Sequence, residues 1–146
     1  MQDKKEKTCI IYCRKSAVQQ NNNSSIESQE EILKAIANKR RLEVKKVFES
    51  LGTTTKIKEL VEWINENRTD YLLTMGIDRL YRRQTDFNQI LELIQRKRLK
   101  GIITPNKDFD AQRDISSILI LGLFCNFERE IISKRIRAGI QAKRNK

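Results

Sequence analysis

The sequence predicts an α/β domain with a mainly parallel sheet of four to five strands flanked by helices. Short β-branched or apolar runs alternate along the chain with stretches of helical periodicity, which is typical of strand–helix–strand units. One run, 71–77, is apolar almost without interruption, as in a strand covered on both faces. The chain of 146 residues is long enough for one domain with a sizeable core, and a second independent domain is not expected.

The expected strands and helices each have a local signal. Residues 42–48 alternate apolar and charged side chains, as a half-exposed strand does. A capping box, Ser24-x-x-Glu27, predicts that a helix follows the polar loop 17–25 and ends near Arg40. The other predicted strands are 8–13, 71–77 and 101–104, with further helices over about 56–67 and 86–98 and a turn at 51–55.

The last predicted element is a long helix. From about Asp114 to the end of the chain no residue strongly breaks a helix, and apolar positions give way to a basic tail. Such a helix could reach roughly 30 residues, or about 45 Å, which is more than so small a domain can cover. Its apolar stripe therefore predicts a partner, most simply the same helix of a second copy.

Charge and composition narrow the classes of partner. A net charge of +11 favours a polyanion, either nucleic acid or an anionic membrane surface, and nucleic acid is the stronger expectation. The apolar runs are too short for a membrane span and the N-terminus has no signal-peptide pattern, so we expect a cytoplasmic protein. Three cysteines without a C-x-x-C pair, in a chain without histidine, do not predict a zinc site.

Two predicted strands end in side chains suited to phosphate chemistry. Arg14 and Ser16 follow the first strand, and Asp78, Arg79 and Arg82 follow the third. Neighbouring parallel strands place their carboxyl ends at one edge, where guanidinium groups could hold phosphate oxygens in bidentate fashion. With no histidine available, Ser16 would need arginine-based activation. Taken alone, Asp78 and Arg79 would be an ion pair in a surface turn about as readily.

Four motifs in this order resemble the catalytic domain of the serine site-specific recombinases, the resolvase/invertase family. The resemblance covers nearly the whole chain, and the segment 102–110 is most similar to the large serine integrase and transposase branch. The motifs are Tyr12-x-Arg14-x-Ser16, Ser25-Ile26-Glu27-Ser28-Gln29, Asp78-Arg79-Leu80-x-Arg82, and Glu128-Arg129 with Arg135 and Gly139.

The resemblance implies cleavage and rejoining of DNA through a 5′-phosphoserine link at Ser16, without metal, ATP or other cofactor. It also implies a homodimer that forms a tetramer at synapsis, with no role for a membrane. Of the other matching residues, the resemblance implies that Arg14, Arg79 and Arg82 bind the scissile phosphate, with Asp78 and Gln29 supporting them and Tyr12 packing beneath the site. On the long helix, it implies that Glu128 and Arg129 serve dimer contacts and closure of the active site. It also implies that Arg135, Arg137, Lys143 and Arg144 approach DNA.

The resemblance divides the chain into a catalytic region, 1–112, and a long dimerisation helix, 113–146, of the same domain. No helix-turn-helix or zinc-ribbon pattern follows, so we expect no separate DNA-reading domain in this chain. The segment after the second strand offers only Lys56 or Lys58 where the family usually has an arginine. Two alternatives stay open. One is a catalytically weak or inactive truncated recombinase that binds DNA and regulates full-length partners by dimerising with them. The other is a basic α/β module that binds free phosphate or a nucleotide.

Overall fold

The computed structural model describes residues 7–15, 25–51, 56–80 and 84–144, and the side chains of 124–133 and 140–144 are not among them. Within these ranges five strands form one sheet in the order β2-β1-β3-β4-β5. The elements along the chain are β1 (Lys7–Lys15), α1 (Ile26–Lys39), β2 (Leu42–Leu51), α2 (Ile57–Asn67), β3 (Tyr71–Thr74), the 3₁₀ turn η2 (Ile77–Leu80), α3 (Gln84–Gln95), β4 (Gly101–Ile103), β5 (Asp108–Asp110) and α4 (Ile115–Arg144).

The sheet is parallel except at one edge, which confirms the predicted fold class. β1 pairs with β2 on one side and with β3 on the other, and β4 pairs with β3, all in parallel. The first and third predicted strands are therefore neighbours. Their carboxyl ends meet at one edge of the sheet, as the sequence predicted.

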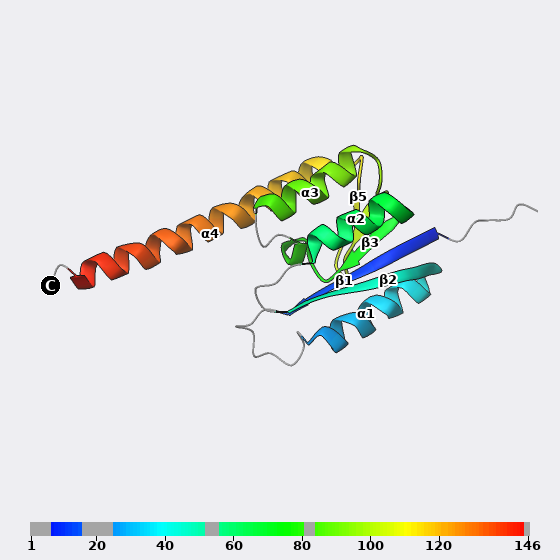
Figure 1. Cartoon of the computed structure of the whole chain (residues 1–146), viewed down its shortest axis with the longest axis horizontal. Helices are drawn as coiled ribbons and strands as arrows, with labels where there is room; N and C mark the ends of the chain where they lie inside the picture. Colours follow the sequence, from blue (N-terminus) through cyan, green and yellow to red (C-terminus); the bar gives the residue numbers. More distant parts are fainter. Residues whose placement is uncertain (1–6, 16–24, 52–55, 81–83, 145–146) are drawn as a thin grey trace, which may run out of the picture.

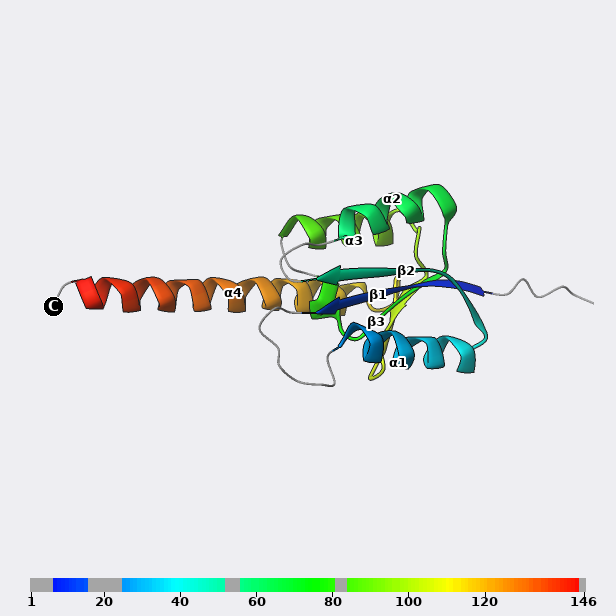
Figure 2. The ribbon, with the colours of Figure 1, turned by 60° about the horizontal axis from the view of Figure 1, so that its bottom comes forward.

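Helices cover both faces of this sheet. In Figure 2, α1 lies on one side, and α2 and α3 lie on the other. The side chains of β1 alternate accordingly: Cys9, Ile11 and Cys13 pack with α1, whereas Ile10 and Tyr12 enter the core formed with α2 and α3. All five are fully buried, so β1 is an interior strand covered on both faces.

Several element boundaries differ from the prediction, two of them next to the candidate site. The helix cap is Ser25 rather than Ser24, because Ser25 has an extended backbone and its Oγ accepts the amide hydrogen bond of Ser28 at 3.1 Å. β3 ends at Thr74, and Ile77 belongs to η2. Gly76 lies between β3 and η2, and a Cβ there would lie 2.4 Å from Asp78 Oδ1, which an exposed carboxylate can avoid by rotating.

The strand β5 was missed. No strand was predicted after residues 101–104, yet residues 108–110 pair antiparallel with β4. Phe109 is only 6% exposed and lies opposite Ile102. One buried side chain in three residues gives no readable period in the sequence, and the strand forms because Phe109 completes the core.

The long helix α4 starts close to its predicted position and extends away from the sheet in Figure 1. Its first turns pack on the domain, where a Cβ at Gly122 would lie 2.1 Å from the Phe87 ring of α3. On the same helix, Ile120, Leu123 and Ile136 are about 60% exposed, at 65%, 62% and 59%. None of the helices in the described ranges combines the length and apolarity that crossing a membrane requires.

Candidate active site

The carboxyl end of β1 is fixed by a side chain from α1. The backbone N–H of Arg14 donates to Gln29 Oε1 at 3.1 Å, and Gln29 Nε2 donates to the Arg14 carbonyl at 2.9 Å. Gln29 is 1% exposed and Arg14 is 8% exposed, so both hydrogen bonds form out of water. The pair fixes the strand two residues before Ser16.

The second predicted motif reaches the same point. Arg79, which comes from η2 after β3, donates from Nη1 to the Arg14 carbonyl at 3.0 Å. One carbonyl oxygen thus accepts from both Gln29 and Arg79. The structure therefore brings together Arg14, Gln29 and Arg79, which the sequence placed in three separate motifs, and Asp78 lies exposed beside them in η2.

Tyr12 ties the neighbouring strand to this edge. Its hydroxyl donates to Ser50 Oγ at 2.9 Å, and the same oxygen accepts the backbone N–H of Lys56 at 2.9 Å. Burial of the ring raises the pKa of Tyr12 above its ordinary value, although the Ser50 hydrogen bond works in the opposite direction. Tyr12 is therefore a neutral hydrogen-bond donor that links β1, the end of β2 and the start of α2.

Two residues of this region were missed by the sequence prediction. Ser50 is the shared acceptor just described, and nothing in the pattern of β2 distinguished it from any other polar residue at a strand end. Asp86 lies in the first turn of α3 with 4% exposure, and its Oδ2 has no hydrogen-bond partner among the described residues. Its charge contributes to the raised pKa of Tyr12, and α3 packs on the same face of the sheet as Tyr12.

The remaining predicted site residues are described only in part. Ser16 and Arg82 lie outside the described residues. Glu128, Arg129, Lys143 and Arg144 fall within α4, but their side chains lie outside the described part. Arg135 and Arg137 are exposed on α4.

The cysteines described in this sheet are poor nucleophiles. Burial raises the pKa of Cys9 to about 11 and that of Cys13 to about 12, so both thiols stay protonated near neutral pH. They act as small buried apolar side chains. No group of three histidine, cysteine, aspartate or glutamate side chains is placed to hold a metal within the described ranges.

A mainly parallel α/β sheet, with Arg14 and Arg79 meeting at the carboxyl ends of β1 and β3, defines the class of fold. The chain belongs to the family described as "Resolvase, N terminal domain", whose match spans residues 9–146. It is a serine recombinase domain, as the motifs predicted. No curated protein matches the chain.

Solved structures share the fold at low sequence identity. The N-terminal catalytic domain of TP901-1 integrase is 23% identical with a TM-score of 0.59, covering 86% of this chain and 98% of its own. A resolvase family site-specific recombinase from Streptococcus pneumoniae is 21% identical with a TM-score of 0.64, covering 96% and 99%. The C-terminal catalytic domain of ISC1926 TnpA, an IS607-like serine recombinase, is 19% identical with a TM-score of 0.54, covering 86% and 99%.

Proposed function

We propose that this chain cleaves and rejoins DNA through Ser16. The observation that carries the proposal is the hydrogen bond from Arg79 to the Arg14 carbonyl at 3.0 Å, because it joins two arginine-bearing motifs at one sheet edge. Ser16 follows Lys15, the last residue of β1, in the sequence. A serine beside several guanidinium groups is suited to attack a phosphodiester, since these groups remain charged and offer paired donors to phosphate oxygens.

The proposed step is a transesterification. Ser16 Oγ forms a bond to phosphorus, the bond from phosphorus to the 3′ oxygen breaks, and the serine proton is lost as the leaving oxygen takes up a proton. The products are a 5′-phosphoserine link and a free 3′-hydroxyl, so attack by another 3′-hydroxyl rejoins DNA without an outside energy source. Arg14, Arg79 and Arg82 would stabilise the negative charge on the phosphorane.

Gln29, Tyr12 and Asp78 would support this step, and none of them would attack the phosphate. Gln29 and Arg79 hold the Arg14 carbonyl, and Tyr12 holds the neighbouring strand end. A site whose supporting backbone is fixed before DNA arrives avoids reorganisation during the reaction.

The proposal assigns catalysis to 1–112 and dimerisation and DNA approach to the helix 113–146. The exposed Ile120, Leu123 and Ile136 of α4 would be covered by a second copy, with tetramers formed at synapsis. Arg135 and Arg137 are exposed on the same helix and would contact phosphates, as would Lys143 and Arg144. Analytical ultracentrifugation should find a dimer, and a strict monomer at high concentration would contradict the dimer proposal.

A covalent trap tests the catalytic step. The chain is fused to a sequence-specific DNA-binding module and incubated with a nicked suicide substrate that carries the sites of that module. We expect a protein–DNA adduct that Ser16→Ala abolishes and Ser116→Ala, a change of an exposed serine in α4, retains. No adduct from the unaltered chain, where a related recombinase domain in the same fusion gives one, would overturn the proposal.

A further inference from the structure

A second basic region lies at the amino ends of the strands, whereas the candidate active site lies at their carboxyl ends. A pocket of about 600 Å³ opens where β1 and β3 begin and where α2 and α3 end. Five of its lining residues are basic and one is acidic: Arg68, Arg96, Lys97, Arg98, Lys100 and Asp70. Thr8 also lines it, and a strand rises about 3.3 Å per residue, so the pocket lies roughly 20 Å from Arg14.

We propose that this pocket binds backbone phosphates of nucleic acid and gives the domain a DNA contact remote from Ser16. The proposal shares only the DNA partner with the preceding one and does not depend on Ser16 chemistry. It rests on three observations: the acidic group in the pocket is already occupied, two guanidinium groups share the pocket, and the backbone at two basic residues is strained.

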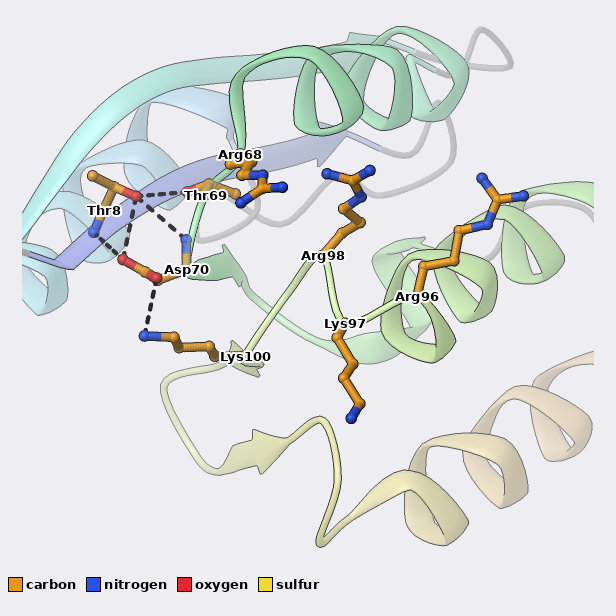
Figure 3. A pocket seen from close by; sticks show the side chains of 8 residues that line it. All are labelled: Thr8, Arg68, Thr69, Asp70, Arg96, Lys97, Arg98 and Lys100. Carbon is orange, nitrogen blue, oxygen red and sulfur yellow. Dashed lines mark hydrogen bonds and ion pairs between the residues drawn. The ribbon is translucent and has the colours of Figure 1, made fainter.

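The carboxylate of Asp70 is fully used within the fold. Its Oδ2 accepts the backbone N–H of Thr8 at 2.8 Å, and its Oδ1 lies 3.3 Å from Lys100 Nζ. The dashed lines in Figure 3 show both contacts. Asp70 therefore fixes the start of β1 and neutralises Lys100, and it leaves no charge to offset the other basic residues.

Three of the remaining cations are left without a counter-ion. Arg96 pairs with Glu92 at 2.7 Å, whereas Arg68, Lys97 and Arg98 form no ion pair with any residue in the described ranges. In Figure 3 the side chains of Arg68 and Arg98 extend toward the same side of the pocket. Two guanidinium groups facing one space repel each other unless an anion lies between them, and phosphate accepts both forks.

The backbone at two of these residues is strained. Lys97 has φ 58° in a helix-ending Schellman motif, in which Arg98 N–H donates to the Leu93 carbonyl and Lys97 N–H to the Ile94 carbonyl. Arg68 has φ 57° with ψ 141°, a region that glycine adopts without the same cost. Cations near helix carboxyl ends also complement the helix dipole, but that benefit does not require positive φ.

The basic character continues along the same edge. Arg41, which follows α1, is the third described residue with positive φ and is again basic. A single phosphate ion would be satisfied by two or three donors, so a row of exposed cations along a sheet edge fits successive phosphates of a strand better.

The test measures how DNA affinity of the whole chain depends on salt. The double variant Arg68→Gly with Arg98→Gln removes both guanidinium groups, and glycine at position 68 relieves strain. A thermal-unfolding curve of the variant separates loss of binding from loss of the fold. The control Lys46→Gln with Lys107→Gln removes two exposed charges outside the pocket and outside the row of cations that includes Arg41. We expect the slope of log K against log salt to fall by about 2 in the pocket variant and to stay unchanged in the control.

Further arms separate the possible ligands. An equal loss of slope in both variants would overturn the proposal in favour of diffuse charge. The nucleic-acid assignment would be overturned if the pocket bound inorganic phosphate in titration calorimetry while the pocket variant kept the full salt slope for DNA. It would also be overturned if the pocket variant changed the oligomeric state alone. Ser16→Ala should keep the full salt slope, and the pocket variant should still form the Ser16 adduct at saturating DNA, so the two proposals fail separately.

Discussion

The side-chain amide of Gln29 takes the place of a missing strand partner for Arg14. The pairing of β1 with β3 stops at Tyr12 and Thr74, two residues short of Arg14. Gln29 Oε1 then accepts from the Arg14 amide at 3.1 Å, and Gln29 Nε2 donates to its carbonyl at 2.9 Å. Because β3 ends early, Gln29 supplies the hydrogen bonds that keep the backbone polar groups of Arg14 satisfied.

The variant Gln29→Met tests whether the Gln29 amide is needed in place of β3 as the hydrogen-bond partner of Arg14. The side chain keeps a similar volume but leaves the Arg14 amide without its partner, so stability should fall by about 1–3 kcal/mol. The rate of adduct formation should fall by about 10- to 100-fold, since a small displacement of the strand end misplaces the reacting groups. Urea titration and the covalent trap measure the two effects, with Glu31→Met, an exposed site on α1, as control. If the variant kept its stability and its rate of adduct formation, the two hydrogen bonds between Gln29 and the Arg14 backbone would be dispensable.

Tyr12 and Ser50 should be energetically coupled. Tyr12→Phe removes the hydroxyl that donates to Ser50 at 2.9 Å, and Ser50→Ala removes the acceptor for both Tyr12 and Lys56. Ser50→Ala should therefore be the more destabilising change, and a double-mutant cycle by urea unfolding should give a coupling of about 1 kcal/mol. Strictly additive losses would mean that this hydrogen bond adds nothing to the fold.

Two glycines of α4 should respond in opposite directions to alanine. A Cβ at Gly122 would lie 2.1 Å from the buried Phe87 ring, whereas a Cβ at Gly139 meets nothing within 4 Å. Gly122→Ala should destabilise the domain by about 1–3 kcal/mol through overpacking. Gly139→Ala should instead raise helix stability by up to about 1 kcal/mol. Thermal unfolding of both variants tests whether α4 packs against Phe87 at Gly122. Equal shifts of the melting temperature in the two variants would contradict this packing.

The buried thiols give a pH-dependent prediction. In a Cys125→Ser background, Cys9 and Cys13 should resist Ellman's reagent at pH 8 until the protein is unfolded. Burial raises their pKa values to about 11 and 12, above the ordinary 9.0. The stabilising contribution of the protonated thiols is therefore complete below about pH 9 and is lost as pH rises through 11 and 12. Rapid labelling of the folded protein at pH 8 would contradict their burial.

The sequence predicted those parts of the site that depend on strand order. Alternation of strands with helices made β1 and β3 neighbours, and the meeting of Arg14 with Arg79 followed from that. The role of Gln29 came from resemblance, and only the structure shows that its amide binds backbone. Ser50 could not be singled out because its partners, Tyr12 and Lys56, depend on how β2 ends beside β1.

Other features depended on tertiary contacts that leave no local signal. The three residues of β5 form a strand because Phe109 covers the core beside β4, not because of their own propensity. The cap of α1 moved by one residue because two adjacent serines could both fill it, and the backbone selects Ser25. The basic pocket joins residues about 30 positions apart, Arg68 and Arg98, at the ends of two helices.

Peptide mapping of the trapped DNA adduct tests the central claim most directly. After nuclease and protease digestion, mass spectrometry should locate a 5′-linked nucleotide remnant on the peptide that contains Ser16, with a free 3′-hydroxyl on the released DNA strand. The remnant should disappear in Ser16→Ala and persist in Ser116→Ala. A remnant on a tyrosine such as Tyr12, or a DNA end that carries a 3′-phosphate, would contradict the account.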